Sequence, residues 1–192
     1  MSKYIEKYPW LRTLNLYTGK VENEYDAMDD IPDGWRIAFG DMLCEELDAA
    51  IKKENAVDTF YIAQLKEKFG ALRIYPSEYN DEIRDIIRKY ETLSHNICVH
   101  CGKPDVNMTY TGWQIPLCKD CFDNHVNDTR EYDQVISSQE KPQMANEIKW
   151  RTYSNESKKW IEHSIDISKT AEKIRENWKK STKNLFQEDG NS

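Results

Sequence analysis

Two Cys-x-x-Cys pairs are the residues of this chain whose types and spacing could do chemistry. Cys98 and Cys101 form the first pair, Cys118 and Cys121 form the second, and sixteen residues separate the pairs. Each pair can close a tight loop around a metal, and together they supply the four thiolates that zinc favours in tetrahedral sites. Because all four positions are cysteine and none is left for water, we expect one structural Zn²⁺ rather than a catalytic one.

Two disulfides or an iron–sulfur cluster are alternative uses of these cysteines. Disulfides need an oxidising compartment, and the first residues, MSKYIEKYPW, hold no hydrophobic core of a secretory signal. No apolar run approaches the roughly 20 residues that span a bilayer, so we expect no membrane segment. The pattern therefore indicates a cytoplasmic chain whose thiolates hold metal, and the spacing fits a zinc ribbon better than a cluster.

The elements around the cysteines have the order of a treble-clef zinc finger. Gly102 follows the first pair, where a turn needs a residue without a Cβ. Residues 108–110 and 114–117 are β-prone, and the Thr111-Gly112 step between them predicts a hairpin turn. The residues after Cys121, FDNHVND, predict a short helix. We therefore expect a finger over residues 98–130, inserted in an α+β fold.

The residues before the finger predict a small core. Residues 1–36 show little periodicity but hold Trp10, Tyr17 and Trp35, so we expect an irregular arm pinned by aromatic side chains. Residues 37–97 predict a helix, a β-hairpin and a second helix that runs directly into the first cysteine pair. In the hairpin, over 59–75, β-formers flank a polar Lys66-Glu67-Lys68 step and Gly70 supplies the break.

After the finger, the sequence predicts a linker at 131–154 and a long C-terminal helix over 155–186, because apolar residues recur there about every seven residues. This region also supplies candidate partner-binding residues: Trp150, Trp160, Ile167, Ile174 and Trp178. The stripe either packs back onto the core, or it mediates self-association or partner binding, since tryptophans at helical spacing can anchor interfaces.

Charge is unevenly distributed along the chain. The net charge is −7, which argues against general affinity for nucleic acid. Residues 22–48 hold ten acidic residues and one basic one, whereas residues 147–183 hold ten basic and six acidic ones. The acidic block is either a solvated face or a surface that mimics DNA or meets a basic partner. Lys66, Lys68 and Arg73 form a small basic spot that we interpret as solvated charge at a strand edge.

The remaining polar residues do not form a catalytic pattern. Cys44, the fifth cysteine, lies among apolar residues of a predicted helix, so we expect a buried and inert thiol. A His-Asn-His nuclease would need a histidine on the finger hairpin, and the stretch MTYTGWQIPL has none. The four histidines are His95, His100, His125 and His163. We therefore expect a protein that is not an enzyme.

Several segments resemble a family of small uncharacterised proteins of phages and prophages. The similarity covers about residues 8–122 and includes DIPDGWRIAFG, QLKEKFGALRIY and CVHCGKPD, of which the second, followed by the cysteine knuckle, is the most recognisable. The resemblance implies a viral or mobile-element origin, and it carries over no activity and no catalytic residues.

These observations predict a zinc-stabilised, non-enzymatic binding protein that docks on a host or phage protein in the bacterial cytoplasm, for example as an inhibitor or regulator of host defence. The alternative is a nucleic-acid-binding accessory protein that uses the finger and the basic, tryptophan-containing C-terminal region, in which tryptophans could stack on bases.

Overall fold

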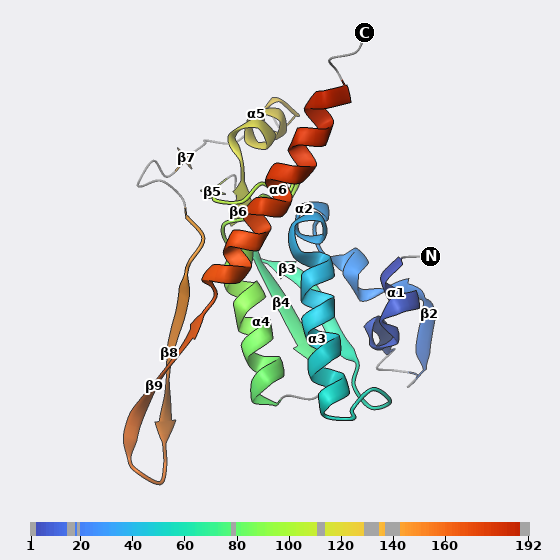
Figure 1. Ribbon diagram of the computed structural model, residues 1–192, viewed down its shortest axis with the longest axis vertical. Coiled ribbons are helices and arrows are strands. Elements are labelled where there is room, and N and C mark those ends of the chain that lie inside the picture. The colour runs from blue at the N-terminus through green and yellow to red at the C-terminus, as the bar shows by residue number, and fades with distance from the viewer. Residues whose placement is uncertain are drawn as a thin grey trace.

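Two helices pack on a β-hairpin at the centre of the molecule, which confirms the predicted helix–hairpin–helix core and the α+β class (Figure 1). The structure is a computed structural model that describes residues 3–14, 18, 20–77, 80–110, 114–128, 135–136 and 143–188. The core elements are α3 (Asp41–Lys53), β3 (Ile62–Lys68), β4 (Ala71–Pro76) and α4 (Asp81–Ser94).

Helix α4 is joined to the hairpin by its buried face and by side chains that close the edge of β4. Its apolar side chains at helical spacing are buried: Ile83, Ile87, Tyr90 and Leu93. The Ser94 hydroxyl accepts a hydrogen bond from the Leu72 amide at 2.9 Å, and Glu91 accepts one from the Ile74 amide at 3.2 Å. These bonds occupy backbone donors that a free strand edge would offer to another chain.

The predicted irregular arm at residues 1–36 is wrong in its described part, which forms short elements. These are α1 (Lys3–Lys7), η1 (Pro9–Leu11), β1 (Arg12–Leu14), β2 (Val21–Asp26), η2 (Ala27–Asp30) and α2 (Asp33–Trp35). Elements of three to six residues are too short to show a hydrophobic period, so the sequence pattern missed them. Trp10 and Trp35 are buried as expected, while Tyr17 lies outside the described residues. A π-helical turn, η3 (Arg36–Gly40), continues from α2 into α3.

The finger has the predicted knuckle–hairpin–helix order. Its elements are β5 (Asn107–Tyr110), β6 (Gln114–Leu117) and α5 (Lys119–Asp128), and a short strand, β7 (Val135–Ile136), pairs with β5. The predicted turn at Thr111-Gly112 lies outside the described residues. So do residues 129–134 and 137–142 of the finger end and the predicted linker.

The predicted helix start at residue 155 is wrong. Strands β8 (Glu147–Ser154) and β9 (Lys159–Asp166) form an antiparallel hairpin that extends away from the body, and only then does α6 (Ser168–Glu188) begin (Figure 1). The apolar residues of this stretch fit a seven-residue repeat, but several also face each other across the strands. The Tyr153 and Trp160 rings lie 5.4 Å apart, and the Trp150 and His163 rings stack at 5.1 Å. Such cross-strand pairs stabilise a hairpin, and counting apolar residues at helical spacing does not detect them.

The proposed partner-binding stripe is therefore divided between three elements. Trp150 lies on β8, Trp160 on β9 and Trp178 on α6. Ile167 and Ile174 are buried in the core with Ala171, so the prediction that these two isoleucines bind a partner is wrong. Their burial docks α6 onto the body, as the packing interpretation of the stripe expected.

The first third of the chain meets the cysteine loop through backbone atoms. The Gly34 amide donates to the Val99 carbonyl at 2.8 Å, and the Trp35 indole donates to the Ile97 carbonyl at 3.0 Å. A Cβ added at Gly34 would lie 2.1 Å from the Cys98 carbonyl oxygen and 2.7 Å from the Gly102 nitrogen. The two segments therefore approach so closely that no other residue fits at position 34.

We predict that Gly34→Ala destabilises the protein by about 3 kcal/mol or more, because the new methyl group meets backbone that cannot move aside cheaply. Urea unfolding measures the change. Gly40→Ala is the matched control, since its Cβ would first meet the Tyr4 hydroxyl at 2.7 Å, which is the end of a side chain that can shift. Equal losses in the two variants would contradict the rigid backbone contact.

Candidate metal centre

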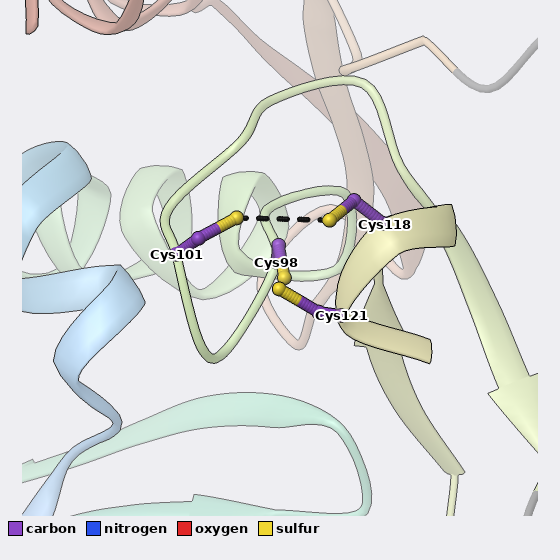
Figure 2. A group of neighbouring side chains, drawn as sticks. All are labelled: Cys98, Cys101, Cys118 and Cys121. Carbon is purple, nitrogen blue, oxygen red and sulfur yellow. Dashed lines mark hydrogen bonds between the residues drawn. The ribbon is translucent and has the colours of Figure 1, made fainter. Parts of the chain in front are cut away.

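The four cysteines come from two segments that converge between α4 and α5 (Figure 2). Cys98 and Cys101 lie in the loop after α4, while Cys118 directly precedes α5 and Cys121 lies in its first turn. Cys98 and Cys118 are buried, and the other two are partly exposed. The structure therefore brings together all four predicted metal ligands.

The sulfur positions fit a single metal ion. All four Sγ atoms lie within 4.8 Å of one another, and Cys101 Sγ is 3.7 Å from Cys118 Sγ (Figure 2). A tetrahedral metal with bonds of about 2.3 Å to sulfur would place its ligands about 3.8 Å apart. The sulfurs are thus near the vertices of a metal–thiolate tetrahedron, and the four residues form a possible metal-binding site.

Backbone hydrogen bonds shape the first cysteine loop before any metal is considered. The Cys98 amide donates to the Lys103 carbonyl at 2.9 Å, and the Gly102 amide donates to the Cys98 carbonyl at 3.0 Å. Gly102 has φ +79°, a conformation that glycine adopts without strain. The Val99 amide donates to the Pro116 carbonyl at 3.0 Å, which joins this loop to β6 just before the second pair.

The electrostatics of the loop favour a thiolate at Cys98. Interaction with the Cys101 thiol, together with nearby backbone amides, lowers the pKa of Cys98, although burial opposes this. The same interaction, together with burial, raises the pKa of Cys101. Burial is the main reason that the pKa of Cys121 is raised to about 12. A metal ion bound by the four sulfurs would replace the protons of these crowded thiols.

Asp105 joins the finger to the C-terminal helix. Its carboxylate accepts two hydrogen bonds from the Arg175 guanidinium on α6, at 2.7 and 2.9 Å, and one from the Met144 amide at 2.8 Å. Partial burial alone would raise the pKa of Asp105, but these donors outweigh it and lower the pKa. The sequence offered no sign of this bidentate pair, whose members are 70 residues apart.

Cys44 and the histidines lie outside the cluster as far as they are described. Cys44 is fully buried, and burial raises the pKa of its thiol, which agrees with the inert role expected. His95 and His100 are exposed, and His163 is on the β8–β9 hairpin. The side chain of His125 is not among the described ones.

The acidic block at residues 22–48 has many partners within the chain. Arg36 pairs with Asp29 and Asp33, and Lys89 pairs with Glu46. Asp48 pairs with Lys52 at 2.7 Å and accepts from the Trp10 indole at 3.2 Å. These contacts favour the interpretation of the block as a structural and solvated face.

Comparisons with protein-family models, with curated proteins and with solved structures find no match to this chain. Among the described helices, none combines the length and the apolar character that crossing a membrane requires.

We expect the purified protein to hold one metal ion per chain, and Cys→Ser at any of the four ligands to lower the free energy of unfolding by more than about 3 kcal/mol, since folding and metal binding are linked. Elemental analysis and thermal melting with and without a chelator measure both effects. Cys44→Ser is the control and should keep the metal. Melting that is insensitive to the chelator would contradict a metal centre.

Asp105→Asn should lower stability by about 1–2 kcal/mol at neutral pH, the range for a partly exposed, charge-assisted hydrogen-bond pair. Asparagine tolerates the φ of +57° at this position, so the change removes the charge and one of the two oxygen acceptors without straining the backbone. Because the pKa of Asp105 is lowered by folding, its contribution is present above the unfolded pKa of about 3.9 and is lost as pH falls through the folded pKa.

Urea unfolding of the wild type and of Asp105→Asn should therefore differ at neutral pH and converge in strong acid. Arg175→Gln and the double variant complete the cycle. Additive effects of the two single changes would show that the pair does not couple the finger to α6.

Proposed function

We propose that this protein is a non-enzymatic binding protein, stabilised by one structural Zn²⁺, that docks on another protein through the β8–β9 hairpin. The observation that carries the proposal is the exposure of Tyr153 and Trp160 near the end of this hairpin. The hairpin extends away from the body of the molecule (Figure 1). The resemblance to phage and prophage proteins suggests a host or phage protein as the partner, with inhibition or regulation of host defence as the role.

Zinc is proposed from the chemistry of the donor set. Four thiolates in a tetrahedron form a closed site with no position for water, which is typical of structural zinc. The cluster also lies where three parts of the chain meet: α4 leads into it, Gly34 packs on it, and Arg175 reaches the loop that follows it. A metal there would stabilise the scaffold that presents the hairpin.

The base of the hairpin is fixed to the body, whereas its end is open. The Arg88 guanidinium of α4 lies 4.2 Å from the Trp150 ring, which stacks in turn on His163. Further out, Trp160 is 65% exposed and Tyr153 is 48% exposed. These two residues face each other on the side opposite to Trp150, since the strand register alternates sides. A fixed base lowers the entropy that the exposed end would lose on binding.

The charge of the hairpin favours a protein partner over a nucleic acid. Glu147–Asp166 contains four basic and four acidic residues, so its net charge is zero. Arg151 pairs with Glu162 at 2.5 Å, and Lys149 pairs with Glu147 at 3.0 Å. Exposed tyrosine and tryptophan beside these paired cations, on a hairpin of zero net charge, resemble the aromatic centres and mixed polar rims of protein–protein interfaces.

We expect the tagged, zinc-loaded protein to capture a specific protein from bacterial lysate that survives nuclease treatment and a high-salt wash. Tyr153→Ser/Trp160→Ser should weaken the complex with the purified partner at least about tenfold, since each aromatic anchor is typically worth about 1–2 kcal/mol or more. Isothermal titration calorimetry measures the affinity.

The matched control is Ile37→Ser/Val57→Ser, which removes two exposed apolar side chains from the body and should leave the affinity unchanged. Equal weakening by both double variants, or capture that depends on nucleic acid, would contradict docking through the hairpin.

A further inference from the structure

A second exposed surface lies on the face of the β3–β4 hairpin that points away from the buried core. The strand register pairs Gln64 with Tyr75 and Lys66 with Arg73, so these four side chains share the face opposite to buried Leu65 and Ile74. Lys68 is the next residue on this face. The face thus presents three cations, and the one carboxylate within the two strands, Glu67, points to the other side.

Aromatic rings lie among these cations. Tyr75 is 40% exposed with the Lys66 ammonium 5.6 Å from its ring centre, and Phe69 at the turn is 60% exposed with the Lys68 ammonium 5.5 Å away. Among the residues that the structure describes, no ion pair occupies Lys66, Lys68 or Arg73. Arg73 donates to the Leu72 carbonyl at 2.8 Å and lies near the Glu91 carboxylate of α4. The face differs in this respect from the strand face of the β8–β9 hairpin that carries Tyr153, where Arg151 and Lys149 are paired, although no described ion pair holds Lys158 or Lys159 at that hairpin's tip.

The turn holds Phe69 in an unfavourable backbone conformation. Phe69 has φ +54° and Gly70 has φ +75°, which are the two left-handed positions of a type I′ turn. Asparagine or glycine normally occupies the first of them, whereas a bulky side chain there is strained. A strained phenylalanine that leaves most of its surface exposed gains little from local packing, so its placement favours a role in binding.

Strands β5 and β6 of the finger pack against this turn. A Cβ at Gly70 would lie 2.5 Å from the Gln114 carbonyl oxygen of β6 and 2.7 Å from the Met108 sulfur of β5. The Glu67 carboxylate accepts from the Gly70 amide at 2.5 Å and is thereby turned inward to the loop. The tip is therefore held in place, and Phe69 is presented at a defined position beside Lys68.

We propose that this face, formed by Gln64, Lys66, Lys68, Phe69, Arg73 and Tyr75, binds single-stranded nucleic acid. Unpaired cations would neutralise phosphates, and the two rings would stack on bases, which is the combination that single-strand-binding surfaces use. This is a different surface from the C-terminal tryptophan region, and it is independent of the β8–β9 docking site.

The test is fluorescence anisotropy of a short fluorescein-labelled oligothymidylate with the zinc-loaded full chain. Three phosphate contacts predict a slope of about −2 for log affinity against log salt, at about −0.7 for each contact on a single strand. Lys66→Gln/Lys68→Gln should weaken binding at least about tenfold and reduce the slope to about −0.7, since one cation remains.

Two controls make the test specific. Lys158→Gln/Lys159→Gln changes the net charge by the same amount on the β8–β9 hairpin and should leave the affinity within about twofold. Phe69→Asn should weaken oligonucleotide binding about tenfold, because one stacking contact is lost. Its melting temperature should be unchanged or higher, because asparagine suits the turn.

Absence of binding at low salt, or equal losses in the two lysine double variants, would overturn the proposal. Poly-L-glutamate that binds as tightly as the oligonucleotide would assign the face to acidic protein segments and would also overturn it. A lower melting temperature for Phe69→Asn would show that Phe69 stabilises the turn, and it would overturn the argument that its strained position serves binding.

Discussion

The contact between Gly34 and the first cysteine loop is the constraint on which the rest of the structure depends. Backbone meets backbone there, with the Gly34 amide bonded to Val99 and no space for a Cβ. Backbone atoms cannot rearrange as side chains do. The first cysteine loop must therefore keep one backbone conformation for Gly34 to pack against it. A metal bound by four cysteines would impose that shape, which explains why the cluster lies where α4, the finger and the N-terminal elements meet.

Specific contacts connect this region to α6 and to the β8–β9 hairpin. Arg175 on α6 reaches Asp105 just after the cysteine loop, while buried Ile167 and Ile174 hold the same helix on the core. Arg88 and Trp150 continue the connection from α4 to the base of the β8–β9 hairpin. These contacts connect the region around the cysteine cluster to α6 and to the base of the β8–β9 hairpin.

The distribution of charge separates two exposed aromatic surfaces. On the face of the β8–β9 hairpin that carries Tyr153 and Trp160, Lys149 and Arg151 are paired with carboxylates, although no described ion pair holds Lys158 or Lys159 at its tip. Around Phe69 and Tyr75, no described ion pair holds Lys66, Lys68 or Arg73. The first arrangement suits a protein surface and the second suits phosphates, although the chain as a whole is acidic. Net charge therefore says little about one face of a protein, because ions in solution screen charges more than about 10 Å away.

The sequence alone determined the parts of this protein that depend on local patterns. Cysteine spacing identified the four members of the cluster, and helical or alternating periodicity located α3, β3, β4 and α4. The sequence did not locate the β8–β9 hairpin. Its ring pairs, Trp150 with His163 and Tyr153 with Trp160, form only when the two strands pair. Only the tertiary structure decided that Gly34 packs on Cys98 and that Asp105 binds Arg175, since such contacts join residues far apart in the chain and leave no periodic trace.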